Sequence, residues 1–306
     1  MYTVSETLRT AINNGTPQRV LLEFTDANAV FSNEDIVVSS GVELDEMFNS
    51  DTDLTIGLCP SAEIRFDMLN DEGQLADFTF GKFKAWLGAR IDSGTPPATA
   101  KTKTFTGGEY PGLYEFTPLG VFIADRPNVV KKKILSITAN DQMCLFDVDM
   151  PELSYPIKLS AMFEAICNAA HVSYKSSTFV NSGFAVSEMP DQFEGATMRD
   201  VLQWIAEMAC STLRFDRDGV LEFTWFNPVN SAYDEHSYSD FSPAWFEIKA
   251  IDGLRVRNSS SSIETSVGSA GNVYLLQNNP FLRIPDPEED DPYEDDPGYV
   301  EGDAEG

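Results

Sequence analysis

Residues 114–146 decide the fold, and they read YEFTPLGVFIADRPNVVKKKILSITANDQMCLF. An apolar run, Gly120–Ala124, is interrupted by the polar and proline residues of Asp125–Pro127. Apolar and polar residues then alternate over Ile134–Ala139, and Asn140–Asp141 follow as a polar turn. Alternation with a period of two is the pattern of β-strands. We therefore expect a pair of strands, in a stretch that contains no candidate catalytic residue.

Further strands are expected on both sides of this pair. Alternating apolar residues predict strands at Val20–Phe24 and Ile64–Phe66, and an apolar run predicts another at Ile36–Val38. The segment Asp92–Gly112 is rich in Gly, Pro, Thr and Lys, which predicts a long exposed loop or an inserted hairpin. The first 150 residues should therefore form a β domain.

Three helices are predicted from apolar residues at helical spacing. The first is Ser5–Asn13, where Ser5 is a suitable N-cap, and the others lie near Leu159–Ala170 and Met198–Ala209. Thr197 and Asp200 resemble a capping pair that begins the last helix. Two one-sided helices after residue 150 indicate a change of domain.

A tight hairpin is expected after the last helix. Apolar residues of Leu213–Asp216 and Val220–Trp225 flank Arg217, Asp218 and Gly219, and Asp-Gly favours the positive φ of such a turn. A calcium loop in this register is disfavoured because Arg214 and Trp225 stand where acidic ligands are needed. The expected fold class is α+β and mainly β.

Composition restricts the class of protein. The chain has 306 residues, 42% of them hydrophobic, which is enough for two or three domains with real cores. Lys and Arg number 21 against 49 Asp and Glu, so the formal net charge is −28. This charge argues against a surface built to grip nucleic acid, which needs cationic side chains.

The negative charge is concentrated near the end of the sequence. Eleven of the acidic residues, and no basic one, lie between Asp286 and Glu305, which leaves a net charge of −17 for the preceding residues. Pro285 precedes this segment, and Pro287, Pro292 and Pro297 interrupt it. Self-repulsion without apolar anchors predicts a disordered acidic tail, with weak calcium binding or a docking role as alternatives.

No set of residues for catalysis or metal binding is recognisable. The two histidines, His171 and His236, lie far apart, without a second ligand at metal-binding spacing. There is no nucleophile elbow, phosphate-binding loop or dinucleotide fingerprint. The four cysteines are separated and lie among apolar neighbours, which predicts buried thiols in a reducing compartment; they are Cys59, Cys144, Cys167 and Cys210.

Four stretches in the same order resemble the hub proteins at the tip of phage tails and of related prophage or contractile-injection baseplates. They are Leu54–Arg65 (LTIGLCPSAEIR), Tyr114–Phe146, Gly195–Phe226 (GATMRDVLQWIAEMACSTLRFDRDGVLEFTWF) and Gly271–Leu282 (GNVYLLQNNPFL). The motif residues suspected of a role in assembly are Gly57, Glu63, Pro118, Gly120, Asp141, Arg199, Asp200, Trp204, Asp218, Gly219, Asn278, Asn279 and Pro280.

The resemblance implies a structural protein and not an enzyme, with no cofactor, metal or catalytic residue. Hubs of this kind are trimers whose two β domains per chain form six similar walls, which adapt the sixfold tail tube to the threefold spike or fibre. The implied partners are a tail tube or distal tail protein and a central spike, fibre or tape-measure protein. DNA would pass through the channel without specific binding, and the chain would not insert into a membrane. It would be assembled in the host bacterial cytoplasm and reside in the virion tail.

On this model the chain divides into five parts. They are an N-terminal helix at 1–16, a β-barrel-like hub domain at 17–150 with the insertion 92–112, an α+β decorating domain at 151–245, the start of a second β hub domain at 246–284, and the acidic tail at 285–306. Hub proteins continue with several strands after the NNPxL segment, whereas here the acidic tail follows. The second β domain is therefore expected to be incomplete.

Two other functions remain open at this point. A host-surface glycan-binding module would use Trp86 and the Asp92–Gly112 loop. A cell-wall hydrolase would need a pair of carboxylates, which nothing singles out among 49 acidic residues.

Overall fold

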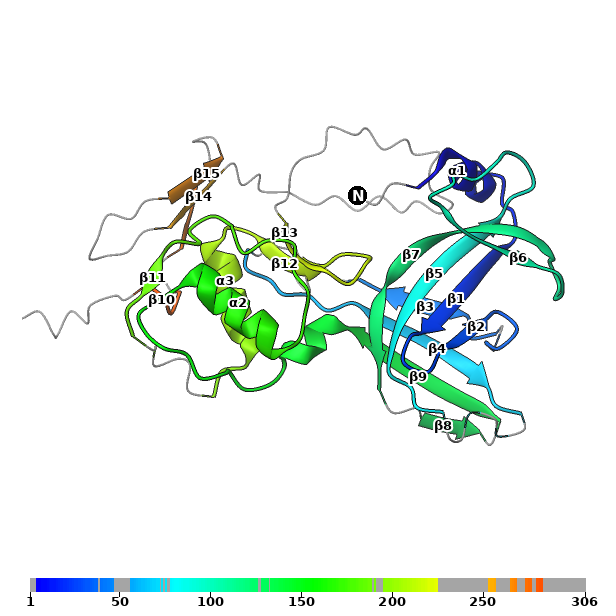
Figure 1. The fold of residues 1–306 in the computed structure, drawn as a ribbon, viewed down its shortest axis with the longest axis horizontal. Helices are drawn as coiled ribbons and strands as arrows, with labels where there is room; N and C mark the ends of the chain where they lie inside the picture. The colour runs from blue at the N-terminus through cyan, green and yellow to red at the C-terminus, as the bar shows by residue number, and fades with distance from the viewer. Residues whose placement is uncertain are drawn as a thin grey trace, which may run out of the picture.

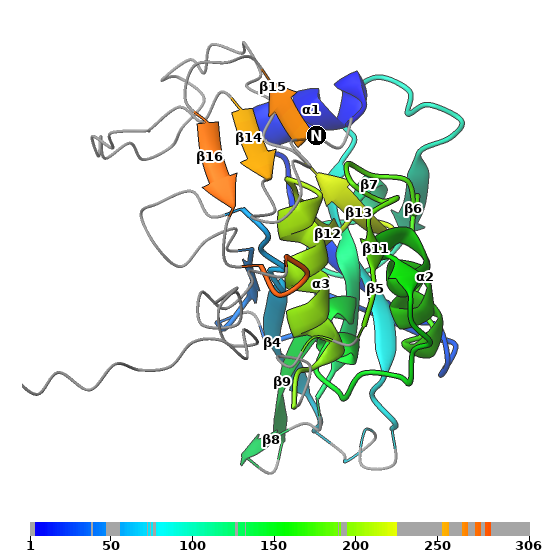
Figure 2. The same cartoon turned by 90° about the vertical axis from the view of Figure 1, so that its left-hand side faces the viewer.

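The computed structural model describes residues 4–37, 39–46, 56–71, 73, 75, 78–125, 128–131, 133–188, 190, 195–224, 253–256, 265–268, 273–276 and 279–282. A large β-sheet lies at one end of the long axis and a domain with two helices at the other (Figure 1). Turning the molecule brings these helices in front of the sheet (Figure 2). The prediction of a mainly β fold of the α+β class is confirmed.

The β domain is one nine-stranded sheet. Its main path has the order β2-β1-β5-β7-β9-β4-β3, with β6 paired to β7 and β8 paired to β9. The strands are β1 (Gln18–Phe24), β2 (Ala29–Ser32), β3 (Val42–Asp45), β4 (Glu63–Leu69), β5 (Lys82–Arg90), β6 (Lys101–Phe105), β7 (Gly112–Ala124), β8 (Asn128–Lys131) and β9 (Ile134–Asp141). In the described residues this sheet is open and does not close into a barrel.

One face of the sheet curls around an aromatic core. Phe24 stacks on Phe83 with 4.7 Å between ring centroids, and Phe83 also meets Phe66 edge-on at 5.9 Å. Phe66 lies on β4 and Phe83 on β5, and two other strands separate them in the sheet. Their contact therefore requires a strongly curved sheet, which buries Leu22 and Phe122 in the same cluster.

Two predictions for this domain are confirmed, namely the helix near its start and a hairpin within the segment Asp92–Gly112. Helix α1 (Glu6–Asn13) begins at Ser5, whose hydroxyl accepts a hydrogen bond from the Leu8 amide. Leu8 and Ala11 pack on Ala89 of β5. The inserted segment forms a hairpin, because β6 pairs antiparallel with the start of β7.

Other predictions for this domain need correction. Ile36 makes only an isolated bridge to Met68, and Val38 lies outside the described residues, so the expected strand there is wrong. The paired strands β7 and β9 meet only from Phe122 to Ala124, because β8 occupies part of the connection. Asp141 ends β9 and is the N-cap of the 3₁₀ helix η1 (Gln142–Phe146), where a polar turn was expected.

The α+β domain is built on two helices. Helices α2 (Leu159–Ala169) and α3 (Met198–Met208) bury their apolar faces in one core with η1 and the hairpin of β12 (Thr212–Phe215) and β13 (Leu221–Thr224). A short pair, β10 (Ile157–Lys158) and β11 (Ala185–Val186), completes this domain. Gly219 has φ +77° in the hairpin turn, as expected of Asp-Gly.

A separate three-stranded sheet contains β14 (Gly253–Val256), β15 (Thr265–Gly268) and β16 (Val273–Leu276). Strand β14 is central, antiparallel to β15 and parallel to β16. The acidic segment from Asp286 onward lies outside the described residues, as do His236 and Trp225.

The capping pair of α3 gives a first prediction. The Thr197 hydroxyl accepts from the Asp200 amide, and Asp200 accepts from the Thr197 amide, which is a full capping box. Thr197→Ala should therefore lower the free energy of unfolding by about 1 kcal/mol. Chemical denaturation measures this change, with Thr178→Ala at an exposed loop position as the matched control. Equal effects of the two substitutions would contradict the role of the cap.

Candidate functional site

Residues of the first three motif stretches meet where the β domain joins the α+β domain, and Asn279 of the fourth stretch contacts α3 beside them. The chain leaves the β domain after β3, and residues 56–62 run along α3 and β12 before the chain returns at β4 (Figure 1). We call residues 56–62 the linking segment. We call the polar contacts around it and around the tip of the β12–β13 hairpin the junction.

The linking segment is bound to the α+β domain through its backbone. The Gly57 amide donates to Ser211 O at 3.0 Å, and the Leu213 amide donates to Leu58 O at 2.9 Å. Gly57 has φ +87°, and an added Cβ would lie 2.1 Å from Cγ of Glu207. Only glycine combines this backbone conformation with so close an approach to α3.

Asp141 binds the same segment from the β domain. Its carboxylate accepts hydrogen bonds from the Ser61 hydroxyl at 2.8 Å and from the amides of Ala62 and Met143, each at 3.0 Å. The side chain is almost fully buried, and burial raises the pKa of Asp141, while these hydrogen bonds act in the opposite direction. A carboxylate with three donors and little access to solvent is suited to holding backbone in place.

Arg199 of α3 completes the attachment of the linking segment. Its Nε and Nη2 donate to Cys59 O at 3.1 and 2.8 Å, and its Nη1 lies 3.3 Å from the carboxylate of Asp147, just after η1. The guanidinium thus joins α3 both to the linking segment and to the end of η1. This fork of donors is a contact that a lysine would not reproduce.

The tip of the β12–β13 hairpin docks on the β domain with three consecutive residues. Arg217 pairs with Glu46 at 2.6 Å, and Asp218 accepts from Lys84 Nζ at 2.6 Å. The buried Gln142 side chain donates to Gly219 O at 2.7 Å. An added Cβ at Gly219 would lie 2.7 Å from Gln142 Nε2, so this glycine allows the close approach.

A β-bulge in β7 receives the hairpin tip. The register between β5 and β7 shifts where Ala85 pairs with Gly120 and Trp86 pairs with Pro118, which leaves Leu119 outside the ladder. The Leu119 carbonyl accepts from Arg217 Nη1. Pro118 and Gly120 therefore belong to the junction because they flank the bulge that offers this carbonyl.

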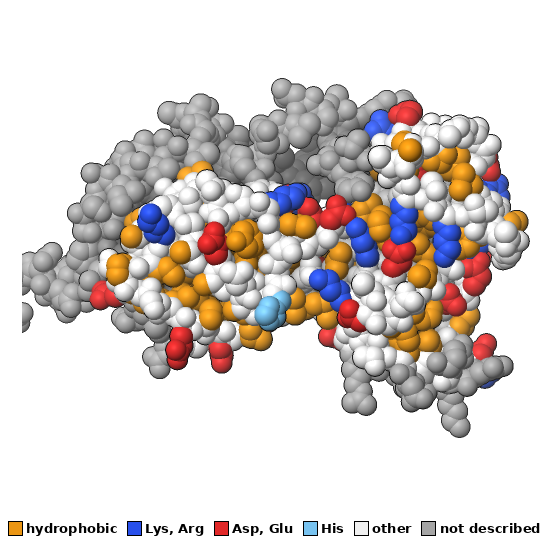
Figure 3. Space-filling view, viewed as in Figure 1, with side chains coloured by type: hydrophobic (Ala, Val, Ile, Leu, Met, Phe, Trp, Pro, Cys, Tyr) orange, Lys and Arg blue, Asp and Glu red, His pale blue; other side chains and the backbone are white. Residues whose placement is uncertain are grey.

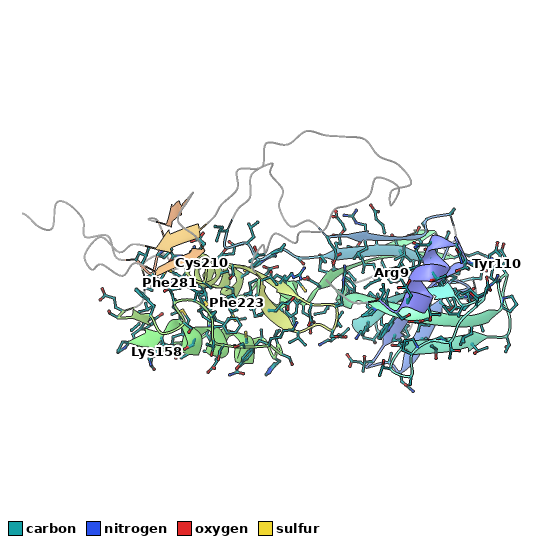
Figure 4. The ribbon with its side chains drawn as sticks, turned by 90° about the horizontal axis from the view of Figure 1, so that it is seen from above. Arg9, Tyr110, Lys158, Cys210, Phe223 and Phe281 are labelled. Atoms are coloured by element: carbon teal, nitrogen blue, oxygen red, sulfur yellow. The ribbon has the colours of Figure 1, made fainter. Side chains whose placement is uncertain are left out.

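Asn279 fixes the last described segment to α3. Its Nδ2 donates to Trp204 O and to Glu207 Oε2, both at 2.8 Å, and its Oδ1 accepts from the Phe281 amide. Phe281 and Leu282 are buried in the core of the α+β domain, which also contains Cys210 (Figure 4). Burial raises the pKa of Glu207, and the Asn279 amide acts in the opposite direction.

The remaining motif residues have local roles. Glu63 pairs with Arg65 on β4, Asp200 belongs to the capping box, and Trp204 meets Phe281 edge-on at 6.4 Å. Pro280 follows Asn279 and is half-buried. Asn278 lies outside the described residues. Among the described motif residues, all but Glu63, Asp200, Trp204 and Pro280 therefore contact or lie beside the junction.

Several junction residues were not identified from sequence. The contacts of the junction and of α3 beside it involve Ser61, Gln142, Glu207, Arg217 and Lys84. In each of these pairs the partner lies more than 70 residues away in the chain, so no short sequence pattern marks the contact. Arg217 was recognised only as the residue before the predicted Asp-Gly turn, and not for its contacts.

The described residues offer little for covalent or metal chemistry. Burial raises the pKa of the Cys144 thiol to about 11 and that of Cys167 and Cys210 to about 12, and it also raises that of Cys59. Such thiols are poor nucleophiles at neutral pH. No group of three His, Cys, Asp or Glu in the described part of the chain is placed to hold a metal ion. No described helix is long and apolar enough to span a membrane.

The tight approach at Gly57 gives a second prediction. Gly57→Ala forces a left-handed backbone on alanine and a clash with Glu207, so it should destabilise the chain by more than about 1 kcal/mol. The matched control is Gly183→Ala, because Gly183 has open space around its Cα and no left-handed φ. The midpoint of urea unfolding measures both. Equal midpoints for the two variants would show that the linking segment is not held as described.

The buried Glu207 gives a third prediction, which concerns pH. Because its folded pKa is raised above the ordinary carboxyl value of 4.5, its contribution to stability is present below that value and is lost as the pH rises through the folded pKa. Glu207→Gln keeps an oxygen that accepts from Asn279 and removes the charge. Its stability relative to the wild type should therefore increase as the pH rises above 4.5.

Urea unfolding at a series of pH values measures this difference, with Glu152→Gln at an exposed position as the control. A stability difference that stays constant or shrinks with rising pH would contradict the assignment.

Comparison with models of protein families finds no match, and comparison with curated proteins finds none. Among solved structures, the chain is similar to the 43 kDa tail protein of prophage MuSo2 from Shewanella oneidensis, with a TM-score of 0.46, 9% sequence identity, and coverage of 86% of this chain and 72% of that one. It is similar also to the tail protein from Neisseria meningitidis MC58, with a TM-score of 0.46, 11% identity, and coverage of 87% and 72%.

Proposed function

We propose that this chain is a structural component of a phage-type tail, and more specifically a tail-tip or baseplate hub. It would assemble as a trimer that adapts the sixfold tail tube to a threefold spike or fibre and leaves a channel for the genome. The supporting observation is that residues of three hub-like stretches meet at one junction between two domains, where Asp141 and Arg199 hold the linking segment and Gln142 holds the hairpin tip. Asn279 of the fourth stretch is bonded to α3 beside this junction, at the Glu207 side chain that lies against Gly57.

A rigid junction suits a part of an assembly. Subunits around a symmetry axis must present their surfaces at a fixed angle, because a small change in that angle prevents the ring from closing. Here Asp141, Arg199 and Gln142 tie the two domains through buried or half-buried hydrogen bonds on both sides of the linking segment. The motif residues therefore act on shape, which supports a structural role over an enzymatic one.

The carboxylates with raised pKa values do not form a hydrolytic site. Asp141 accepts three hydrogen bonds, and Glu207 accepts from Asn279 while lying against Gly57. Each is committed to backbone or amide donors within the junction. A general acid must instead reach a substrate atom, and neither carboxylate is placed to do so.

The glycan-binding alternative receives no support from Trp86. Its Nε1 donates to Glu23 at 2.7 Å, and the ammonium groups of Lys84 and Lys101 lie 4.4 and 4.3 Å from its ring centroid. The ring is half-buried and engaged with its own chain, whereas a sugar platform needs a free aromatic face.

Assembly gives the fourth prediction. Acidic chains repel one another, so self-association should be weak at low salt and should strengthen as salt shortens the Debye length to about 10 Å at 0.1 M. Mass photometry across a salt series, with particle images, should reveal threefold rings, formed by the chain alone or with tail-tube protein. A lasting monomer without affinity for any tail component would reject the hub.

The same preparation separates the other functions. Zymography on peptidoglycan should show no cleavage, and a glycan array should show no binding. Cleavage that disappears when one carboxylate is substituted would replace the structural proposal with a hydrolytic one.

A further inference from the structure

One face of the β domain carries a concentration of lysines that contrasts with the rest of this acidic chain. Lys82, Lys84 and Trp86 alternate along β5, so they share the face opposite the aromatic core, and Lys101 and Lys103 alternate along β6. We call these five residues the basic face. Figure 3 shows basic and apolar side chains gathered on the visible side of this domain.

Contacts between the side chains support this assignment. Lys84 and Lys101 both lie over the Trp86 ring, although they come from different strands, and Lys103 lies 5.1 Å from the Phe105 ring centroid. Lys82 and Lys103 are exposed, while Lys84 and Lys101 keep 24% and 30% of their side chains exposed. The ammonium groups are therefore accessible to a ligand.

Internal partners neutralise only part of the positive charge. Lys101 pairs with Glu23 and Lys84 pairs with Asp218, whereas Lys82 donates to the uncharged Gln142 side chain. Four lysines thus stand against two carboxylates on this face. An ammonium group has three donors, so the paired lysines also retain donors for a further acceptor.

We propose that the basic face binds the acidic segment Asp286–Glu305 of the same chain. The segment carries eleven carboxylates and no basic residue, which complements the excess of lysine. Its prolines favour extended backbone, which can follow the direction of a strand, and Tyr293 and Tyr299 add apolar contact area. This inference goes beyond the structural role proposed above and does not depend on it.

The length of the chain permits this contact. Leu282 is anchored in the core of the α+β domain. The 24 residues that follow Leu282 include the acidic segment. Extended backbone spans about 3.3 Å per residue, or roughly 80 Å in all. A globular body of this size is about 50 Å across. Covalent attachment also gives the segment a local concentration in the millimolar range, so that weak contacts suffice.

Zero-length carbodiimide cross-linking of the full chain, followed by mass spectrometry, tests the proposal, because the reagent joins only lysines and carboxylates in direct contact. Carboxylates of 286–305 should link to Lys82, Lys101 and Lys103 in preference to Lys158, which is exposed on the α+β domain. Mixing isotope-labelled and unlabelled chains should give links within one chain. Links distributed by exposure alone, links mainly between chains, or no links would overturn the proposal.

A charge reversal supplies the matched pair of variants. Lys103→Glu lies outside the junction and should reduce links to the other lysines of the basic face several-fold, whereas Lys158→Glu should leave them unchanged. The links should also disappear at 1 M salt, where the Debye length falls to about 3 Å. Equal effects of the two variants, or links that persist at 1 M salt, would show that the contact is not electrostatic.

Discussion

The structure depends on the linking segment being bound from two sides at once. Its backbone groups are enclosed between the domains, and enclosed amides and carbonyls require partners. Ser211 and Arg199 supply them from the α+β domain, and Asp141 supplies them from the end of β9. These partners are distant in sequence, so the segment is fully bonded only when both domains are folded.

The second contact of the junction has a different physical character. The hairpin tip presents the charges of Arg217 and Asp218 to Glu46 and Lys84, which retain partial exposure. Exposed pairs of this kind add little stability. Their geometry nevertheless selects one orientation of the hairpin, because a rotated hairpin would lose the charge pairs and the Leu119 carbonyl together. The hydrogen bonds to buried amides hold the junction together, and the charge pairs at the hairpin tip select the orientation of the hairpin.

Sequence reasoning succeeded where the interaction is local. The Ser5 cap, the Thr197–Asp200 capping box and the Asp-Gly hairpin each involve residues a few positions apart, and the structure confirms all three. It failed at Ile36, where an apolar run reads as a strand but only a single bridge forms. The bulge at Leu119 gave no signal either, since a shift of register depends on the partner strand.

Several residues of the candidate site could be predicted from the sequence, but the contacts that they make could not. Gly57, Asp141, Arg199 and Asn279 were identified through their motifs, yet nothing in the sequence shows that the first three form one junction and that Asn279 is bonded beside it. Asn279 illustrates the reason, because it contacts Trp204 and Glu207 more than 70 positions earlier in the chain. Contacts between residues so far apart in sequence depend on the path of the chain through the fold. A local sequence pattern carries no information about that path.

The motif residues lie in internal contacts, and this restricts which surfaces could contact another protein. Most of the described motif residues are used in internal contacts of the junction, and a side chain buried in such a contact is not available to a second protein. The resemblance to hub proteins therefore reflects how two domains are joined. Under the proposed hub function, recognition of a tail partner should therefore depend on exposed residues outside the motifs. Residues such as Val30 at the edge strand β2 and Val148 after η1, each about half exposed, are of this kind. An exposed edge strand offers unpaired backbone groups to another chain, so β2 is a better candidate for contact with a partner than the motif residues, whose side chains are used inside the junction.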